Sequence, residues 1–147
     1  MARVSTGERR AVAAWTRPAE LALFDGMHVA DRRHGLDVVA HLRRAGVTDR
    51  DVLAAGLLHD CSKGNTGVGP RVAWSLGEAF GPWVVALAAR VPGWRVALDR
   101  LRNHAESSAA LAEGAGLPAR AVDLVRYQAE PRDPEYGLLL LAADEAC

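Results

Sequence analysis

The chain has 147 residues and a mass of 15.7 kDa, enough for one compact domain that buries about two-thirds of the surface of its unfolded chain. Half of the residues are hydrophobic, and the 18 Lys and Arg residues balance the 18 Asp and Glu residues. This composition excludes a disordered chain, and without a basic excess we expect no nucleic acid polymer and no membrane as a partner. The longest apolar stretches, near residues 83–89 and 138–143, are too short to span a bilayer.

Cysteine usage and the N-terminal residues indicate the cellular compartment. Cys61 and Cys147 are the two cysteines of the chain, too few for a disulfide framework. Residues 1–10 are polar and lack the apolar core of a signal peptide. We therefore expect a soluble, cytoplasmic protein.

Proline, glycine and capping residues divide the chain into helical segments, and no segment shows the sustained alternation of a β-strand. The sequence predicts an all-α fold, a single compact domain of about seven to nine helices. In chain order, helical segments are expected at 7–16, 18–24, 28–45, 49–60, on either side of Gly81-Pro82, at 94–102, from Asn103 to Gly114, after Pro118 and after Pro134.

Several of these boundaries depend on individual residues. Gly46 is the expected C′ residue of the third segment. The residues Thr48–Asp51 resemble a capping box at the start of the fourth. Asn103 is a candidate N-cap, and Pro118 and Pro134 each suit the opening of a helix.

Two aspartates end segments that are apolar nearly all round. Asp60 closes the run 52–60, and Asp144 closes the run 138–144. A helix with no polar face is normally buried, and an isolated buried carboxylate costs several kcal/mol unless it caps, pairs or binds a metal. A nearby cation is the simplest remedy, although a solvated helix end or a partner arginine is an alternative.

Two histidines are placed to share a site with these aspartates. His59 directly precedes Asp60, and His34 lies in the middle of the third segment. Two neutral imidazoles and two carboxylates would form a neutral complex with a divalent ion. Mixed N/O ligation with positions left for water suits Mn²⁺, Fe²⁺, Co²⁺, Ni²⁺ or Mg²⁺ better than a closed zinc site. A hydrogen-bonded core histidine is the alternative for each residue.

These residues lie in four segments that match one pattern in order. The segments are 31–39 with His34, 57–64 with His59-Asp60 and Lys63, 103–106 with His104 (followed by Gly116-Leu117-Pro118), and 141–144 with Asp144. This arrangement resembles the HD-domain superfamily of metal-dependent phosphohydrolases, helical proteins with an H…HD…D ligand pattern. The resemblance implies one HD-like domain over residues 1–147, with a motif-bearing core at about 28–146 and an N-terminal helical extension at 1–27.

The resemblance also implies a ligand set. By it, His34, His59, Asp60 and Asp144 are the metal ligands. The dinuclear branch of the family adds histidines for a second metal. His104 matches one of these, whereas Gln128 stands in a segment where relatives commonly carry histidine. We therefore expect one firmly held ion and a weaker possible second site at His104 and Gln128.

The implied reaction is hydrolysis of a phosphomonoester or phosphodiester, such as a nucleotide, by metal-activated water. The expected catalytic residues are Asp60, Lys63 and His104. Lys63, the only lysine of the chain, could contact the phosphate or orient Asp60. His104 could be a second-site ligand, a general acid near the leaving group or a helix-start residue. The candidate substrate-binding residues are cations: Lys63, Arg33, Arg71 and Arg126.

Two other functions are compatible with such a fold. One is a catalytically silent module that senses a ligand or binds a partner, which the complete set of site residues argues against. The other is a di-iron oxygenase, which needs a histidine near Gln128.

Cys61 lacks a free base to activate it, so we expect a small buried side chain. Because Asp144 lies three residues before Cys147, a partner subunit could help to close the site in a homodimer.

Overall fold

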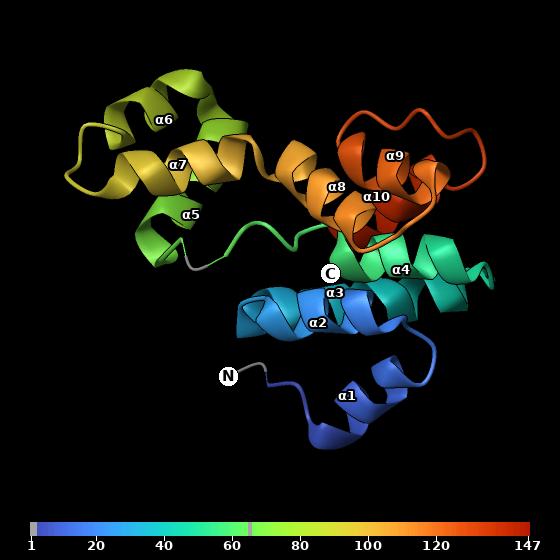
Figure 1. The fold of residues 1–147 in the computed structure, drawn as a ribbon. Coiled ribbons are helices and arrows are strands. Elements are labelled where there is room, and N and C mark those ends of the chain that lie inside the picture. Colours follow the sequence, from blue (N-terminus) through green and yellow to red (C-terminus); the bar gives the residue numbers. More distant parts are fainter. Residues whose placement is uncertain (1–2, 65) are drawn as a thin grey trace.

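The computed structural model describes residues 3–64 and 66–147, and within these ranges the chain is built from ten α-helices and contains no strand (Figure 1). The predicted all-α fold is confirmed. No helix among the described residues is long and apolar enough to cross a membrane. The helices are α1 (Thr6–Ala13), α2 (Pro18–Gly26), α3 (Val29–Arg44), α4 (Arg50–Leu58), α5 (Val68–Phe80), α6 (Pro82–Ala88), α7 (Trp94–Arg102), α8 (His104–Gly114), α9 (Ala119–Arg126) and α10 (Gly137–Glu145).

The predicted end of α3 is confirmed. Gly46 has a φ of 88°, the left-handed conformation that favours glycine. Its N–H donates to the carbonyl of Arg43, and the N–H of Val47 donates to the carbonyl of Leu42, both at 3.0 Å. These two bonds form a Schellman motif that ends the helix.

At three helix starts the structure differs from the prediction in the capping interaction or in the first helical residue. Asp49 rather than Thr48 caps α4, and no capping box forms because the third helical residue is Val52. Asn103 is the N-cap residue of α8 as predicted, but its side chain makes no capping bond there, and its amide donates to the carbonyl of Asp99 near the end of α7. After Pro134 the chain forms a turn in which the backbone N–H groups of Glu135 and Tyr136 donate to the carboxylate of Asp133, and α10 begins only at Gly137.

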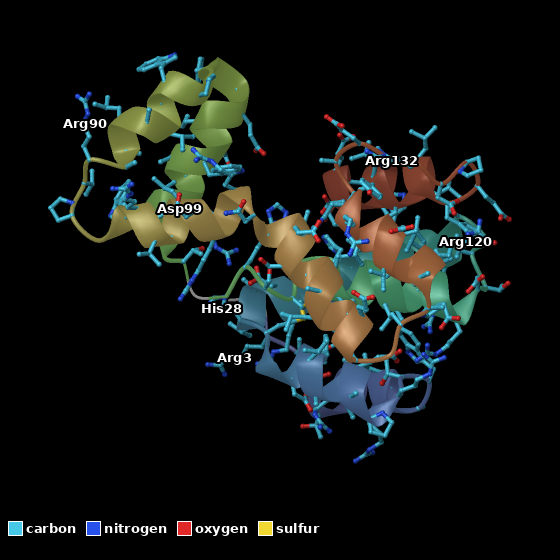
Figure 2. The ribbon with its side chains drawn as sticks, turned by 45° about the horizontal axis from the view of Figure 1, so that its top comes forward. Arg3, His28, Arg90, Asp99, Arg120 and Arg132 are labelled. Atoms are coloured by element: carbon cyan, nitrogen blue, oxygen red, sulfur yellow. The ribbon has the colours of Figure 1, made fainter. Side chains whose placement is uncertain are left out.

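The helices form a main body and a small lobe, which both views show standing apart from α1–α4 (Figures 1 and 2). The main body consists of α1–α4 and α8–α10 around one hydrophobic core, with α4 at its centre and all of its residues from Val52 to Leu58 buried. The small lobe consists of α5–α7, residues 68–102, and has its own minor core of Val85, Leu98 and Leu101.

The N-terminal extension packs onto the same core. Val12 of α1 and Phe24 of α2 belong to the main hydrophobic cluster. Glu20 of α2 is fully buried, and its carboxylate pairs with Arg50 at the start of α4 and accepts a hydrogen bond from the backbone N–H of Arg17. This buried ion pair joins the extension to the central helix.

Arg50→Met removes the closer of two cations from the buried Glu20 and leaves only Arg17, whose Nη1 lies 3.4 Å from Oε1, so we expect the free energy of unfolding to fall by about 3 kcal/mol. Arg9 pairs with Asp25 at the surface, and Arg9→Met serves as the control with an expected loss of less than about 1 kcal/mol. Urea denaturation of both variants measures the difference. Equal losses in the two variants would contradict the structural role of the buried pair.

Candidate metal centre

Three predicted ligands from separate helices meet at one carboxylate oxygen. His34 comes from α3, His59 is the C-cap of α4, and Asp144 lies in the last turn of α10. Oδ1 of Asp144 lies 2.7 Å from Nε2 of His34 and 3.1 Å from Nε2 of His59. Each residue offers one ligand atom, and these atoms all lie within 4.8 Å of one another. The group could therefore hold a metal ion.

The backbone of α4 orients His59. The ring is almost completely buried, and its Nδ1 lies 2.8 Å from the carbonyl of Gly56. Donation from Nδ1 to this carbonyl leaves Nε2 facing Asp144, and Nε2 is the atom that a neutral ring would offer to a metal, an arrangement common in metal-binding histidines. Burial alone would lower the pKa of His59, but attraction to Asp60 and the hydrogen bond with Asp144 outweigh burial and raise it.

Asp144 remains ionised beside the two imidazoles. Burial alone would raise the pKa of its carboxyl, but the hydrogen bonds with His34 and His59 outweigh burial and hold that pKa well below its usual range. An anionic oxygen between two imidazole nitrogens is a donor set that suits a divalent ion of intermediate softness.

Asp60, the fourth predicted ligand, lies beside this group in the turn that follows α4. Its carboxylate is 3% exposed, and Oδ2 lies 2.5 Å from Nζ of Lys63 and 3.6 Å from Nε2 of His59. Burial alone would raise the pKa of Asp60, but the positive charges of His59 and Lys63 outweigh burial and lower it. Asp60 is therefore an anion.

One oxygen of Asp60 has no hydrogen-bond partner. Oδ1 is buried and unsatisfied, and Nε2 of His104 lies 3.7 Å from it, beyond hydrogen-bond distance. A buried anionic oxygen without a partner is costly, and a cation would satisfy it. Together with the convergent His34, His59 and Asp144, this orphaned atom shows that the residues present fit a divalent ion.

The predicted second-site residues also lie next to Asp60. Nδ1 of His104 lies 2.5 Å from the carbonyl of Leu101 at the end of α7, and its Nε2 is the nitrogen that approaches Asp60. The amide nitrogen of Gln128 donates to the carbonyl of His59 at 3.3 Å, so this hydrogen bond holds the Gln128 side chain against the turn that carries His59 and Asp60. A second ion at these residues stays a prediction.

Sequence reasoning missed two serines that position this turn. Oγ of Ser62 donates to the carbonyl of His104 at 2.8 Å, and Oγ of the buried Ser108 donates to Oγ of Ser62 at 2.9 Å. They join the Asp60 turn to α8. The available signal was that Ser108 lies four residues after His104, on the same face of α8.

The predicted arginines do not gather at the site. Arg33 pairs with Glu8 and Asp37 on the side of α3 that faces α1. The hydrogen bond that Arg33 donates to Glu8 lowers the pKa of Glu8 to about 2. Arg126 pairs with Glu106 and Asp123 and does not line the pocket described below. Each has acidic neighbours within reach, and these pairs hold both guanidinium groups away from the metal centre.

Arg71 lies near the centre but is already engaged. Its guanidinium forms a two-fold hydrogen bond with the buried Asp31 at 2.9 and 3.0 Å, and it also donates to Thr66 and to the carbonyl of Gly64. Arg71 therefore fastens α5 to α3 and contributes positive charge to the pocket as part of an ion pair.

Cys61 is not a nucleophile in this arrangement. Its thiol faces the carbonyl of Ser108 at 3.7 Å, and burial raises the pKa of Cys61 to about 11. The thiol is protonated at neutral pH, in agreement with the prediction that it is a small packing residue.

The metal centre opens into a pocket of about 560 Å³ between the small lobe and the main body. This volume is within the range of small-molecule sites. The main body and the turn after α4 contribute Lys63, His104, Gln128 and Asp144, and the small lobe contributes a face of α5. His28 caps the start of α3 and is not among the residues that line this pocket.

Comparisons with protein-family models, with curated proteins and with solved structures gave no match. The case for a function therefore depends on the geometry and chemistry of the pocket and on the motif resemblance of the sequence.

Because α3 and α4 pack closely at Gly35, a larger residue at this position is expected to weaken metal binding. A Cβ at Gly35 would lie 2.5 Å from the carbonyl oxygen of Leu57, so Gly35→Ala must push the two helices apart and separate His34 from His59. We expect metal affinity to fall by about tenfold or more. Gly114→Ala is the control, because nothing lies within 4 Å of its Cβ position. Calorimetric titration with Mn²⁺ measures both variants, and unchanged affinity in Gly35→Ala would refute this coupling.

Proposed function

We propose that this protein is a metal-dependent phosphohydrolase, acting on a phosphomonoester or phosphodiester such as a nucleotide. The observation that carries the proposal is the convergence of His34, His59 and Asp144 on one oxygen, with the unsatisfied Oδ1 of Asp60 beside them. The resemblance to the HD-domain superfamily supports the same reaction class. The fold alone would not, because one fold hosts many activities.

The residues that would hold the ion are His34, His59 and Asp144, with Asp60 next to them. A divalent ion bound there lowers the pKa of bound water and neutralises charge on a phosphoryl oxygen. The mixed donor set suits Mn²⁺, Fe²⁺, Co²⁺, Ni²⁺ or Mg²⁺, and the identity of the metal is a matter for measurement.

Lys63 serves both the carboxylate and the substrate in this proposal. Its ammonium group lies 2.5 Å from Oδ2 of Asp60 and also lines the pocket. It fixes the orientation of Asp60 and keeps it ionised, and its remaining N–H groups are available to a phosphate oxygen.

His104 is placed to move a proton. The contact of its Nδ1 with the carbonyl of Leu101 fixes the ring, and its Nε2 faces Asp60 at the edge of the pocket. A protonated Nε2 could donate to the oxygen of the leaving group, which would complete hydrolysis without a further reactant.

The other predicted functions have less support. A silent module has no need of a complete donor set. A di-iron oxygenase needs a histidine in the segment of Gln128, and Gln128 offers only a weak amide oxygen in its place. The cytoplasmic location and the homodimer stay predictions.

The first experiment measures metal content and hydrolysis together. Purified protein is loaded in turn with Mn²⁺, Fe²⁺, Co²⁺, Ni²⁺ or Mg²⁺, and its metal content is determined by mass spectrometry. Hydrolysis of 4-nitrophenyl phosphate and bis(4-nitrophenyl) phosphate is then followed. We expect bound metal and hydrolysis in the wild type, and loss of both in His59→Ala. His41→Ala is the matched control, because His41 lies on α3 outside the convergent group.

Two results would overturn the proposal. Wild-type protein that retains no metal, or that binds metal and hydrolyses no phosphate ester, would exclude a phosphohydrolase. Two irons per chain with consumption of oxygen would favour the oxygenase instead.

A further inference from the structure

One stripe of α5 forms the small-lobe wall of the pocket. Its residues are Arg71, Trp74, Ser75 and Glu78, spaced i, i+3, i+4 and i+7. This spacing places the four side chains on one face of the helix, one turn after another. The pocket wall therefore changes in chemical character along the helix axis, from cation through aromatic ring to carboxylate.

The stripe has a defined direction relative to the metal centre. Arg71 is bonded to Asp31, which lies three residues before His34 on the same face of α3. The Arg71 end therefore lies beside the metal centre. At a rise of 1.5 Å per residue, Glu78 lies about 10 Å farther along the axis.

Trp74 presents a fixed, flat surface in the middle of the stripe. Its ring is half-buried against the minor core of the small lobe, and its Nε1 donates to Oε1 of Glu78 at 3.0 Å. The neighbouring pocket residues Leu101 and Leu141 are also apolar. A planar unsaturated group can stack or pack edge-to-face on such a ring.

Glu78 sets the polarity of the far end. A carboxylate repels a phosphate, so the phosphate is expected near Lys63 and the metal ligands instead. Its second oxygen is free to accept a hydrogen bond from an N–H group. The stripe thus matches a substrate with phosphate at one end and a donor at the other.

Building on the proposed phosphohydrolase function, we propose that Trp74 and Glu78 form a specificity-determining subsite for the leaving group. The subsite takes a phosphate ester whose leaving group ends in a planar ring with an N–H donor, so that the ring lies on Trp74 and the donor reaches Glu78. Hydrolysis breaks the P–O bond to this leaving group, and water supplies both the new P–O bond and the proton on the released oxygen.

Three phosphate monoesters separate the two contributions. Ribose 5-phosphate has no ring system beyond the sugar, purine riboside 5′-phosphate adds a planar base without N–H donors, and guanosine 5′-phosphate adds adjacent N–H donors. We expect kcat/KM of the metal-loaded wild type to rise in this order. The ratio of the second ester to the first measures the contribution of the plane, and the ratio of the third to the second measures that of the donors.

Each variant should reduce one ratio. Trp74→Leu is expected to lower the plane ratio by about tenfold, and Glu78→Gln the donor ratio by about tenfold. Trp83→Leu and Glu113→Gln are the matched controls, because both residues are exposed and neither lines the pocket. The metal content of every variant is measured alongside. If Trp74→Leu fails to fold, the donor ratio of Glu78→Gln tests the subsite instead, because Glu78 is exposed and its replacement leaves the packing of the lobe unchanged.

The outcomes distinguish this inference from the proposed function. If the wild type hydrolyses the esters but Trp74→Leu and Glu78→Gln keep the ratios of their controls, the subsite is refuted while the phosphohydrolase stands. If the metal-loaded wild type hydrolyses none of the esters in this set or the nitrophenyl set, both fall.

Discussion

The metal centre depends on how closely α3 approaches α4. At Gly35 the two helices come so near that even a methyl group would collide with the carbonyl of Leu57, and Gly56 in turn faces Leu42 of α3 at a distance that leaves no room for a Cβ. This double contact puts His34 beside His59, with ring centroids 5.2 Å apart. At this separation the two imidazoles can reach one ion from separate helices, and the close packing at Gly35 holds them there.

The chain treats its buried carboxylates in two different ways. Glu20 and Asp31 are each matched with an arginine, Arg50 and Arg71, whose guanidinium reaches across from another helix. Asp60 receives the only lysine, on one oxygen, while the other oxygen has no partner. The first arrangement neutralises a charge and joins two helices. The second keeps a carboxylate ionised with one oxygen unused, which is expected of a ligand and not of a structural ion pair.

The helices could be predicted from local signals, whereas the set of His34, His59, Asp60 and Asp144 came from the burial argument for the two aspartates together with the motif resemblance. The run that ends on Asp60 is buried as its apolar composition indicates, whereas the side chain of Asp144 is 35% exposed and Leu138 of α10 is exposed. The arginines could not be placed in this way, since the partners of Arg33 and Arg126 lie on other helices as well as their own. The Ser62–Ser108 hydrogen bond joins residues 46 positions apart, and the Arg71–Asp31 ion pair joins residues 40 positions apart. Such pairings follow from tertiary packing, which periodicity does not encode.

The pocket is lined by two separate parts of the molecule, the main body and the small lobe. The metal ligands belong to helices of the main core, whereas the α5 stripe belongs to a lobe whose own core is only Val85, Leu98 and Leu101. The Arg71–Asp31 pair joins the lobe to α3 next to His34 and so fixes where the stripe begins. Residues on α5 beyond Arg71 can then change without disturbing the ligands, because they are set apart from the main core. Under the proposed function, a lobe attached in this way would let leaving-group preference vary while the chemistry at the candidate metal centre stays the same.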